Sequence, residues 1–226
     1  METILFHGSD KIIEFPSKQG GRIHNDFGQG FYCTPDLNLA REWACTERPT
    51  AFVNHYSFEP GLALKVCDLS GPDYHILNWL ALLWANRVFQ VETGAPAAIK
   101  EYILQTFLPD LSDFDVIRGY RADDSYFQYA KFFLDGGMNI DQLKYAMHLG
   151  NLGEQVFLQS QKAFDALVFL SADPVDKAVF LPMRQARENK ARESFHKMKT
   201  GPQVLDGIFA LDLYRNQMKN DDERLR

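Results

Sequence analysis

The run Phe-Gly-Gln-Gly-Phe-Tyr-Cys-Thr at residues 27–34 constrains the fold more than any other stretch of the sequence. Two glycines one residue apart lead directly into an aromatic strand, and Pro35 and Asp36 then open a helix. Glycines let a backbone turn tightly or approach a neighbour more closely than a Cβ would allow, so this strand could hold Tyr32 at the wall of a cleft. The pattern is equally typical of a turn that feeds a core strand, because a lone Gly-x-Gly is a weak signal.

Two distant segments also read as strands with polar groups at their ends. Residues 3–6 predict a short buried strand that delivers His7, and residues 154–158 predict a late strand opened by Glu154 and Gln155. Alternation along a strand directs these last two side chains to opposite faces. We therefore expect only one of them to face a shared site.

A histidine followed by glycine, a tyrosine after a glycine turn and a Glu or Gln opening a late strand resemble the ADP-ribosyltransferase superfamily. The resemblance is to its His-Tyr-Glu branch, which includes diphtheria toxin and the poly(ADP-ribose) polymerases. Residues 27–32 are similar to the Gly-Lys-Gly-Ile-Tyr block of those polymerases, with Gln29 in place of the lysine. Residues 2–172, including the segments 25–28 and 115–124, also resemble a bacterial family, domain of unknown function 3990, that is commonly grouped with these transferases.

The resemblance implies a set of residues around NAD as substrate. The catalytic residues would be His7 on the adenosine ribose, Tyr32 stacked on the nicotinamide ring, and Gln155 in place of the family's glutamate on the nicotinamide ribose. The NAD-binding residues would be His7, Gly8, Ser9, Asn25, Phe27, Gly28, Gly30, Tyr32 and Asp123.

The amide at position 155 is where the chain departs from the family's pattern. An amide can orient a hydroxyl, but it carries no full charge and cannot act as a general base near neutral pH. This departure favours mono-ADP-ribosylation, NAD cleavage or NAD binding without turnover over polymer formation. Asp123 or Asp124 could supply acidic help, or could simply cap the helix that follows.

Three function hypotheses follow from these residues. The first is an NAD-dependent mono-ADP-ribosyltransferase with a protein or nucleic-acid acceptor, a bacterial toxin or effector that a partner protein could neutralise. The second is a catalytically silent module that binds NAD, ADP-ribose or a partner protein. The third, an RNA 2′-phosphotransferase of the same fold, lacks an arginine-rich set near the cleft motifs. Taken singly, His7, Tyr32 and Gln155 would each read as ordinary structural residues.

Composition and length fit one main domain. The 226 residues are 46% hydrophobic, enough for one packed core. The resemblance implies an α+β fold with a split pair of small, mostly antiparallel sheets that enclose the NAD cleft, with helices packed outside. The expected division is an ADP-ribosyltransferase-like domain at 1–180 and a C-terminal helical extension at 181–226.

The cysteines and the length of the apolar segments indicate the cellular compartment. Three cysteines without metal-ligand or paired spacing suggest neither a disulfide framework nor a zinc site, which fits a reducing cytoplasm. Without an apolar run of about 18 residues or a signal-peptide pattern, we expect no membrane partner. Delivery by a specialised secretion system would not require a cleaved signal peptide.

Charge is distributed unevenly along the chain. The net charge is −6, which argues against a general nucleic-acid-binding protein, yet residues 184–199 hold six Lys or Arg against two Glu. This basic segment could be a solvated helix face, or it could contact RNA, DNA or an acidic partner.

The remaining pattern predicts the other elements. Helices are expected at 34–46 with Thr34 as N-cap, at 74–90, 97–107, 125–134 and 139–149, and a strand is expected at 166–170. The β-like runs 51–58 and 62–69 flank a Pro-Gly turn signal and predict a hairpin. Beyond Pro182 the sequence predicts a basic helix and then an amphipathic segment with an apolar stripe around Ile208. This stripe either packs against the rest of the domain or binds a partner.

Overall fold

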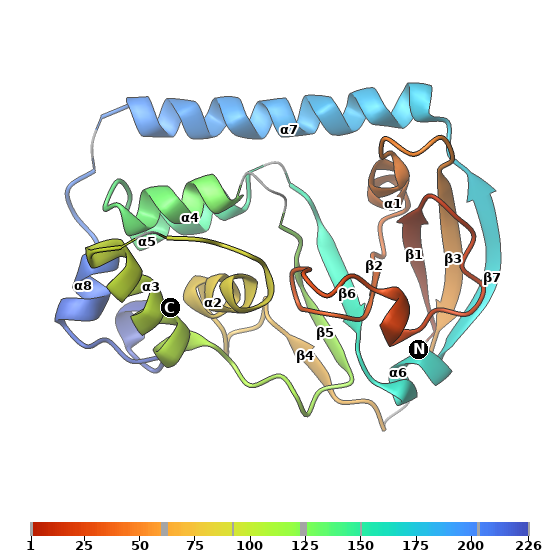
Figure 1. Ribbon diagram of the computed structural model, residues 1–226, viewed down its shortest axis with the longest axis horizontal. Helices are drawn as coiled ribbons and strands as arrows, with labels where there is room; N and C mark the ends of the chain where they lie inside the picture. Colours follow the sequence, from red (N-terminus) through yellow and green to blue (C-terminus); the bar gives the residue numbers. More distant parts are fainter. Residues whose placement is uncertain are drawn as a thin grey trace.

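The computed structural model describes residues 2–59, 63–91, 93–122, 126–149, 151–202 and 204–225. In chain order the strands are β1 (Thr3–Ser9), β2 (Phe31–Cys33), β3 (Phe52–Phe58), β4 (Val66–Asp68), β5 (Val116–Tyr120), β6 (Glu154–Leu158) and β7 (Leu167–Pro174). The helices are α1 (Leu37–Ala44), α2 (Ile76–Asn86), α3 (Ala95–Phe107), α4 (Tyr126–Leu134), α5 (Ile140–Met147), α6 (Gln161–Asp165), α7 (Lys177–Thr200) and α8 (Ala210–Arg215), with short 3₁₀ turns at Lys18–Gly20 and Glu223–Leu225. The expectation of an α+β fold is confirmed (Figure 1).

The strands form two small sheets that meet along one line. The first sheet has the order β1-β3-β7 and the second has the order β2-β6-β5-β4. Every pair is antiparallel except β4 with β5, so the sheets are mostly antiparallel, as expected. The edge strands β1 and β2 are linked by an isolated bridge, in which Phe6 and Thr34 exchange backbone hydrogen bonds of 2.8 and 2.9 Å.

The expected hairpin between 51–58 and 62–69 is wrong. Strand β3 pairs with β1 on one edge and with β7 on the other, so it has no edge left for β4. Strand β4 instead pairs in parallel with β5 in the second sheet. The turn residues 60–62 lie outside the described residues.

Buried apolar side chains cover both faces of the four-stranded sheet. Because successive side chains of a strand alternate between faces, Val116 and Ile117 of β5 enter different clusters. The cluster between the two sheets includes Leu5, Phe31, Cys33, Tyr56, Phe58, Val116, Val156 and Leu158. The cluster on the opposite face includes Phe27, Ile117 and Phe157 and continues into the helical layer. The sheets and helices therefore form three layers with the four-stranded sheet in the middle.

Helix α2 runs through the centre of the helical layer. Its residues from Ile76 to Trp84 are all buried, so the helix is covered by protein around its whole circumference. The buried amide of Asn78 donates hydrogen bonds to the carbonyl of Phe107 and to Asn220 Oδ1. These bonds satisfy a polar group that would otherwise destabilise the core.

The predicted N-cap of α1 is wrong by two residues. The Asp36 carboxylate caps the helix, accepting hydrogen bonds from the backbone nitrogens of Asn38 and Leu39 at 2.8 and 3.1 Å. The Thr34 hydroxyl instead accepts a hydrogen bond from the Asp36 backbone nitrogen at 3.2 Å, and the Thr34 backbone bridges to Phe6.

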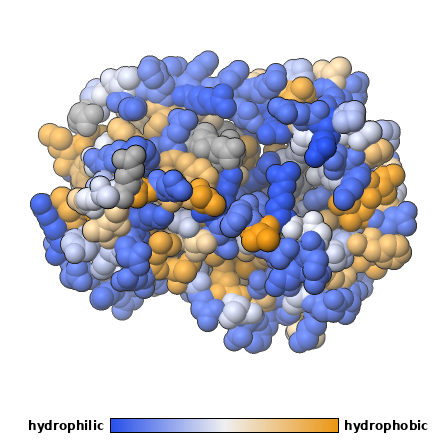
Figure 2. Space-filling view, viewed as in Figure 1, coloured by the Kyte–Doolittle hydropathy of each residue, from blue (hydrophilic) through white to orange (hydrophobic). Residues whose placement is uncertain are grey.

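The 24-residue helix α7 spans the molecule from the three-stranded sheet to the helical layer (Figure 1). Hydrophilic side chains predominate along the upper edge of Figure 2, where Figure 1 places this helix. Phe195 of α7 and Leu213 of α8 are buried in the helical core, so the C-terminal segment packs back on the body. Leu205 remains 85% exposed. The expected division at 180/181 falls inside α7.

Candidate functional site

The structure brings His7 and Tyr32 together at the point where the two sheets separate. His7 follows Phe6, whose backbone bridges to Thr34. The His7 side chain adds a second link between β1 and β2, because its Nδ1 lies 2.6 Å from the Tyr32 carbonyl oxygen. This contact requires a proton on Nδ1, which leaves Nε2 as an acceptor in the neutral ring. Desolvation lowers the pKa of His7, and the hydrogen bond to Tyr32 opposes this effect only in part. The imidazole is therefore neutral at pH 7.

The Tyr32 phenol lies on the other side of β2 from the His7 ring. The imidazole stacks on Phe31 with 4.4 Å between ring centroids, whereas the Tyr32 ring lies 4.7 Å from the Phe157 ring. The Tyr32 hydroxyl donates to the Gly28 carbonyl at 2.7 Å and accepts from the Phe27 backbone nitrogen at 3.0 Å. Burial raises the pKa of Tyr32, so the hydroxyl stays protonated and fixes the loop before β2.

Gln155 is held by two acceptors beside β5. It lies on the same face of the four-stranded sheet as Tyr32, because Tyr32 pairs with Phe157 and Gln155 is two residues from Phe157. Its Nε2 donates to Asp26 Oδ2 and to the Tyr120 carbonyl, both at 3.0 Å. Both hydrogens of the amide nitrogen are thereby used, and the amide oxygen Oε1 is the atom left for another donor.

Asp26 is the functional candidate that the sequence-based site set omits. Its carboxylate is 2% exposed, accepts from the Ala122 backbone nitrogen at 2.9 Å through Oδ2, and lies 3.3 Å from Arg87 through Oδ1. Burial raises the pKa of Asp26, while the bonds to Ala122, Arg87 and Gln155 oppose that rise. The result is a buried carboxyl paired with an amide, which we call the acid–amide pair of Asp26 and Gln155.

Four of the remaining predicted NAD-binding residues serve the protein's own packing. A Cβ on Gly30 would lie 2.3 Å from the Phe157 ring, and a Cβ on Gly8 would lie 2.0 Å from the Ala40 carbonyl oxygen of α1. Phe27 is buried against Tyr32 and Phe157, and the Gly28 carbonyl accepts the Tyr32 hydroxyl.

Of the last three predicted residues, Ser9 ends β1 and Asn25 lies in the loop before β2. The Ser9 hydroxyl bonds the backbone of Lys11, and Asn25 Oδ1 accepts from the Asp26 nitrogen. Asp123 lies outside the described residues, as does Asp124.

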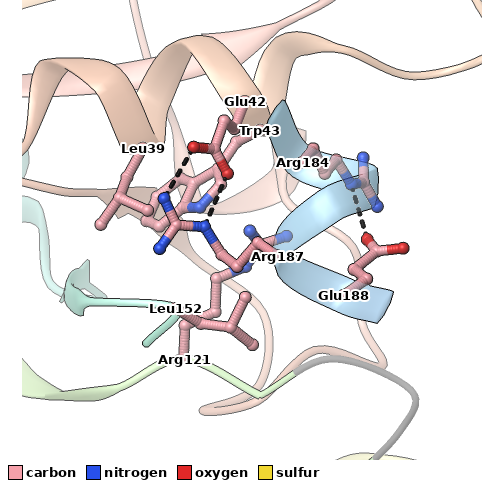
Figure 3. Close-up of a pocket in the computed structure, with 8 residues that line it drawn as sticks. All are labelled: Leu39, Glu42, Trp43, Arg121, Leu152, Arg184, Arg187 and Glu188. Atoms are coloured by element: carbon pink, nitrogen blue, oxygen red, sulfur yellow. Dashed lines mark hydrogen bonds and ion pairs between the residues drawn. The ribbon is translucent and has the colours of Figure 1, made fainter. Parts of the chain in front are cut away.

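A small hollow lies beside the site, between α1, α7 and the ends of β5 and β6 (Figure 3). Its volume is about 20 Å³, which is the size of one water molecule. The Arg121 guanidinium lies 4.5 Å from the Trp43 ring centroid, and Arg187 binds both oxygens of Glu42 at 2.8 and 3.0 Å. These contacts close the space and attach α7 to α1. They were not predicted, because the charged partners are distant in the sequence.

Membrane and metal features can be stated for the described chain only. None of its described helices is both long and apolar enough to cross a lipid bilayer. The same residues contain no cluster of three or more His, Cys, Asp or Glu that could hold a metal ion.

The fold and the site define an α+β domain of two small sheets with a buried acid–amide pair beside a half-buried tyrosine. The family described as "Protein of unknown function (DUF3990)" matches residues 3–169, so the chain belongs to this family. Comparison with curated proteins found no match, and comparison with solved structures found none either.

The lowered pKa of His7 predicts a pH dependence of stability. As the pH falls below about 6.5, the unfolded chain binds a proton that the folded chain does not, so His7 contributes a loss of stability between about 6.5 and its lower folded pKa. His7→Gln can keep a donor for the Tyr32 carbonyl but has no proton to gain. Urea unfolding at about pH 7.5 and pH 5 should show a smaller loss in this variant than in the wild type. His196→Gln, at an exposed position of α7, is the control, and an unchanged loss in His7→Gln would contradict the assignment.

The hydrogen bonds of Gln155 predict that a carboxyl is not tolerated in its place. In Gln155→Glu an oxygen would face two acceptors, so the variant should be less stable by about 1–3 kcal/mol at pH 7.5. Because only the protonated carboxyl can donate, its folded pKa is raised, and the deficit should shrink as the pH falls towards the unfolded value. Urea unfolding at two pH values measures both effects. Gln185→Glu, at an exposed position of α7, is the matched control, and equal stability of Gln155→Glu and wild type would refute the described amide contacts.

Proposed function

We propose that the chain is an NAD-dependent mono-ADP-ribosyltransferase whose acid–amide pair orients the ribose next to nicotinamide. The observation that carries the proposal is the bonding of Gln155, whose Nε2 is committed to Asp26 and Tyr120. This bonding makes Oε1 the acceptor available to a ribose hydroxyl, on the same sheet face as the Tyr32 ring.

His7 and Tyr32 would take complementary parts of the dinucleotide. The Nε2 atom of His7 is left as an acceptor for a hydroxyl of the adenosine ribose, and the Tyr32 ring offers a flat apolar surface to nicotinamide. The His7 ring and the Tyr32 ring lie on opposite sides of β2, but β2 is the outermost strand of its sheet. An extended dinucleotide that passes over this edge could therefore contact both.

The proposed reaction breaks the bond between the nicotinamide nitrogen and ribose C1′. The bonding electrons leave with nicotinamide, which becomes neutral, and C1′ accepts an electron pair from an acceptor nucleophile that loses a proton. Positive charge develops on the sugar in the transition state, so the carbonyl dipole of Gln155 would stabilise it, strengthened by the Asp26 carboxylate behind it.

The same residues argue for transfer of a single ADP-ribose. An amide cannot take the proton from the acceptor near neutral pH, so the acceptor must be a good nucleophile or bring its own base. The acceptor would be a protein or a nucleic acid, and a bacterial toxin or effector with a neutralising partner protein remains part of this proposal.

A second candidate function is a silent module that binds NAD, ADP-ribose or a partner protein. It is favoured by the burial of Gln155, which is 2% exposed and carries no charge of its own. Such a module would hold the dinucleotide without lowering the barrier to cleavage.

Incubation with NAD labelled in its adenylate part tests both candidates. We expect the wild type to release nicotinamide and to transfer label to an acceptor in a cell extract. Tyr32→Ala and His7→Ala should reduce nicotinamide release by about 10-fold or more, the range expected for loss of a positioning contact. Tyr145→Ala, an exposed tyrosine on α5, is the matched control and should match the wild type. Saturable NAD binding without product would support the silent module. The absence of both NAD binding and nicotinamide release would refute the transferase and the NAD-binding form of the module.

A further inference from the structure

The basic segment 184–199 divides into groups with different surroundings. Arg184 and Arg187 are half-buried and bind inward, Arg184 to Glu188 and the Cys45 carbonyl, and Arg187 to Glu42. These two cations are part of the attachment of α7 to α1. They do not account for the rest of the segment.

The C-terminal half of α7 carries its cations on two opposite faces. With about 3.6 residues per turn, Arg192, His196 and Lys199 lie within roughly 60° of one another around the helix axis. Lys190 and Lys197 lie on the opposite face by the same geometry. All five side chains are exposed.

The face with Arg192, His196 and Lys199 borders a cavity of about 320 Å³ between α7 and α4. Figure 1 shows this half of α7 passing over α4. The described lining residues are Gln128, Tyr129, Arg192, Phe195, His196 and Lys199, and none of them is acidic.

The aromatic floor fixes the shape of this cavity. The rings of Tyr129 and Phe195, which line the cavity, lie 4.3 Å apart and are both buried. The Lys199 ammonium lies 5.4 Å from the centre of the Phe132 ring, and no carboxylate of the described residues lies within ion-pair distance of it. Arg192 forms a long, solvent-exposed ion pair with Glu188 at 3.9 Å, which is weak enough for a phosphate to compete with it.

We propose that this cavity between α4 and α7 binds a phosphate-bearing ligand of mononucleotide size. Arg192 and Lys199 would contact the phosphate, as charged donors do in anion sites, and Gln128 offers an amide to polar groups of the organic part. A volume of about 320 Å³ exceeds what phosphate alone would fill and lies at the lower end of small-molecule sites. The net charge of −6 disfavours a long polyanion, so we take a free nucleotide as the ligand.

The proposal is tested by titrating the intact protein with AMP at low salt. Calorimetry gives the affinity, and the ring signals of the histidines in NMR spectra report the place of binding. We expect the His196 signals to shift on addition of AMP. The double variant Arg192→Ala/Lys199→Ala should lose about 10-fold or more in affinity, the size expected for removal of charge-assisted hydrogen bonds. Lys190→Ala/Lys197→Ala removes the same charge from the opposite face and should bind AMP like the wild type.

Other outcomes overturn the proposal. If AMP shifts only the His7 signals, the nucleotide binds beside Tyr32 and the cavity is not its site. If a short single-stranded RNA binds through Arg192 and Lys199 while AMP does not, the segment is a nucleic-acid surface and not a small-ligand site. Equal losses in the two double variants would indicate general electrostatic attraction. Because the AMP readout does not depend on NAD turnover, it is separate from the test of the transferase.

Discussion

The buried carboxylate of Asp26 is the constraint on which the arrangement of the site depends. It joins four segments of the chain: its own loop before β2, Arg87 after α2, the backbone of Ala122 after β5, and Gln155 in β6. A buried carboxylate without partners would be strongly destabilising, so these segments must meet in this register. The position of Gln155 follows from the same requirement, because its amide nitrogen donates to Asp26 Oδ2 at 3.0 Å.

The contacts of Asp26 explain why position 155 holds an amide and not a carboxylate. A glutamate at position 155 would point an oxygen at Asp26 and at the Tyr120 carbonyl, both of which are acceptors. The glutamine is therefore suited to its surroundings, and the acidic group of the site lies one hydrogen bond further away, at Asp26. Under the proposed function, the amide links this group to the ribose through its oxygen.

Local signals made part of the structure predictable. The segments 3–6 and 154–158 each contain three consecutive apolar residues next to polar ones, and both lie in strands of the fold. The pairing of strands was not predictable in the same way. β1 and β7 occupy both edges of β3, so β3 cannot pair with β4 as expected. The burial of Asp26 could not be predicted from the sequence either, because its hydrogen-bond partners lie 61, 96 and 129 residues away along the chain.

The central claim is that the acid–amide pair presents the Gln155 oxygen to the ribose of NAD. A crystal structure of the protein soaked with NAD tests it most directly. We expect the nicotinamide ring against Tyr32, a hydroxyl of its ribose within about 3 Å of Gln155 Oε1, and the Asp26 bond to Nε2 unchanged. A dinucleotide bound elsewhere, or an amide still covered by the protein while NAD is present, would contradict the account.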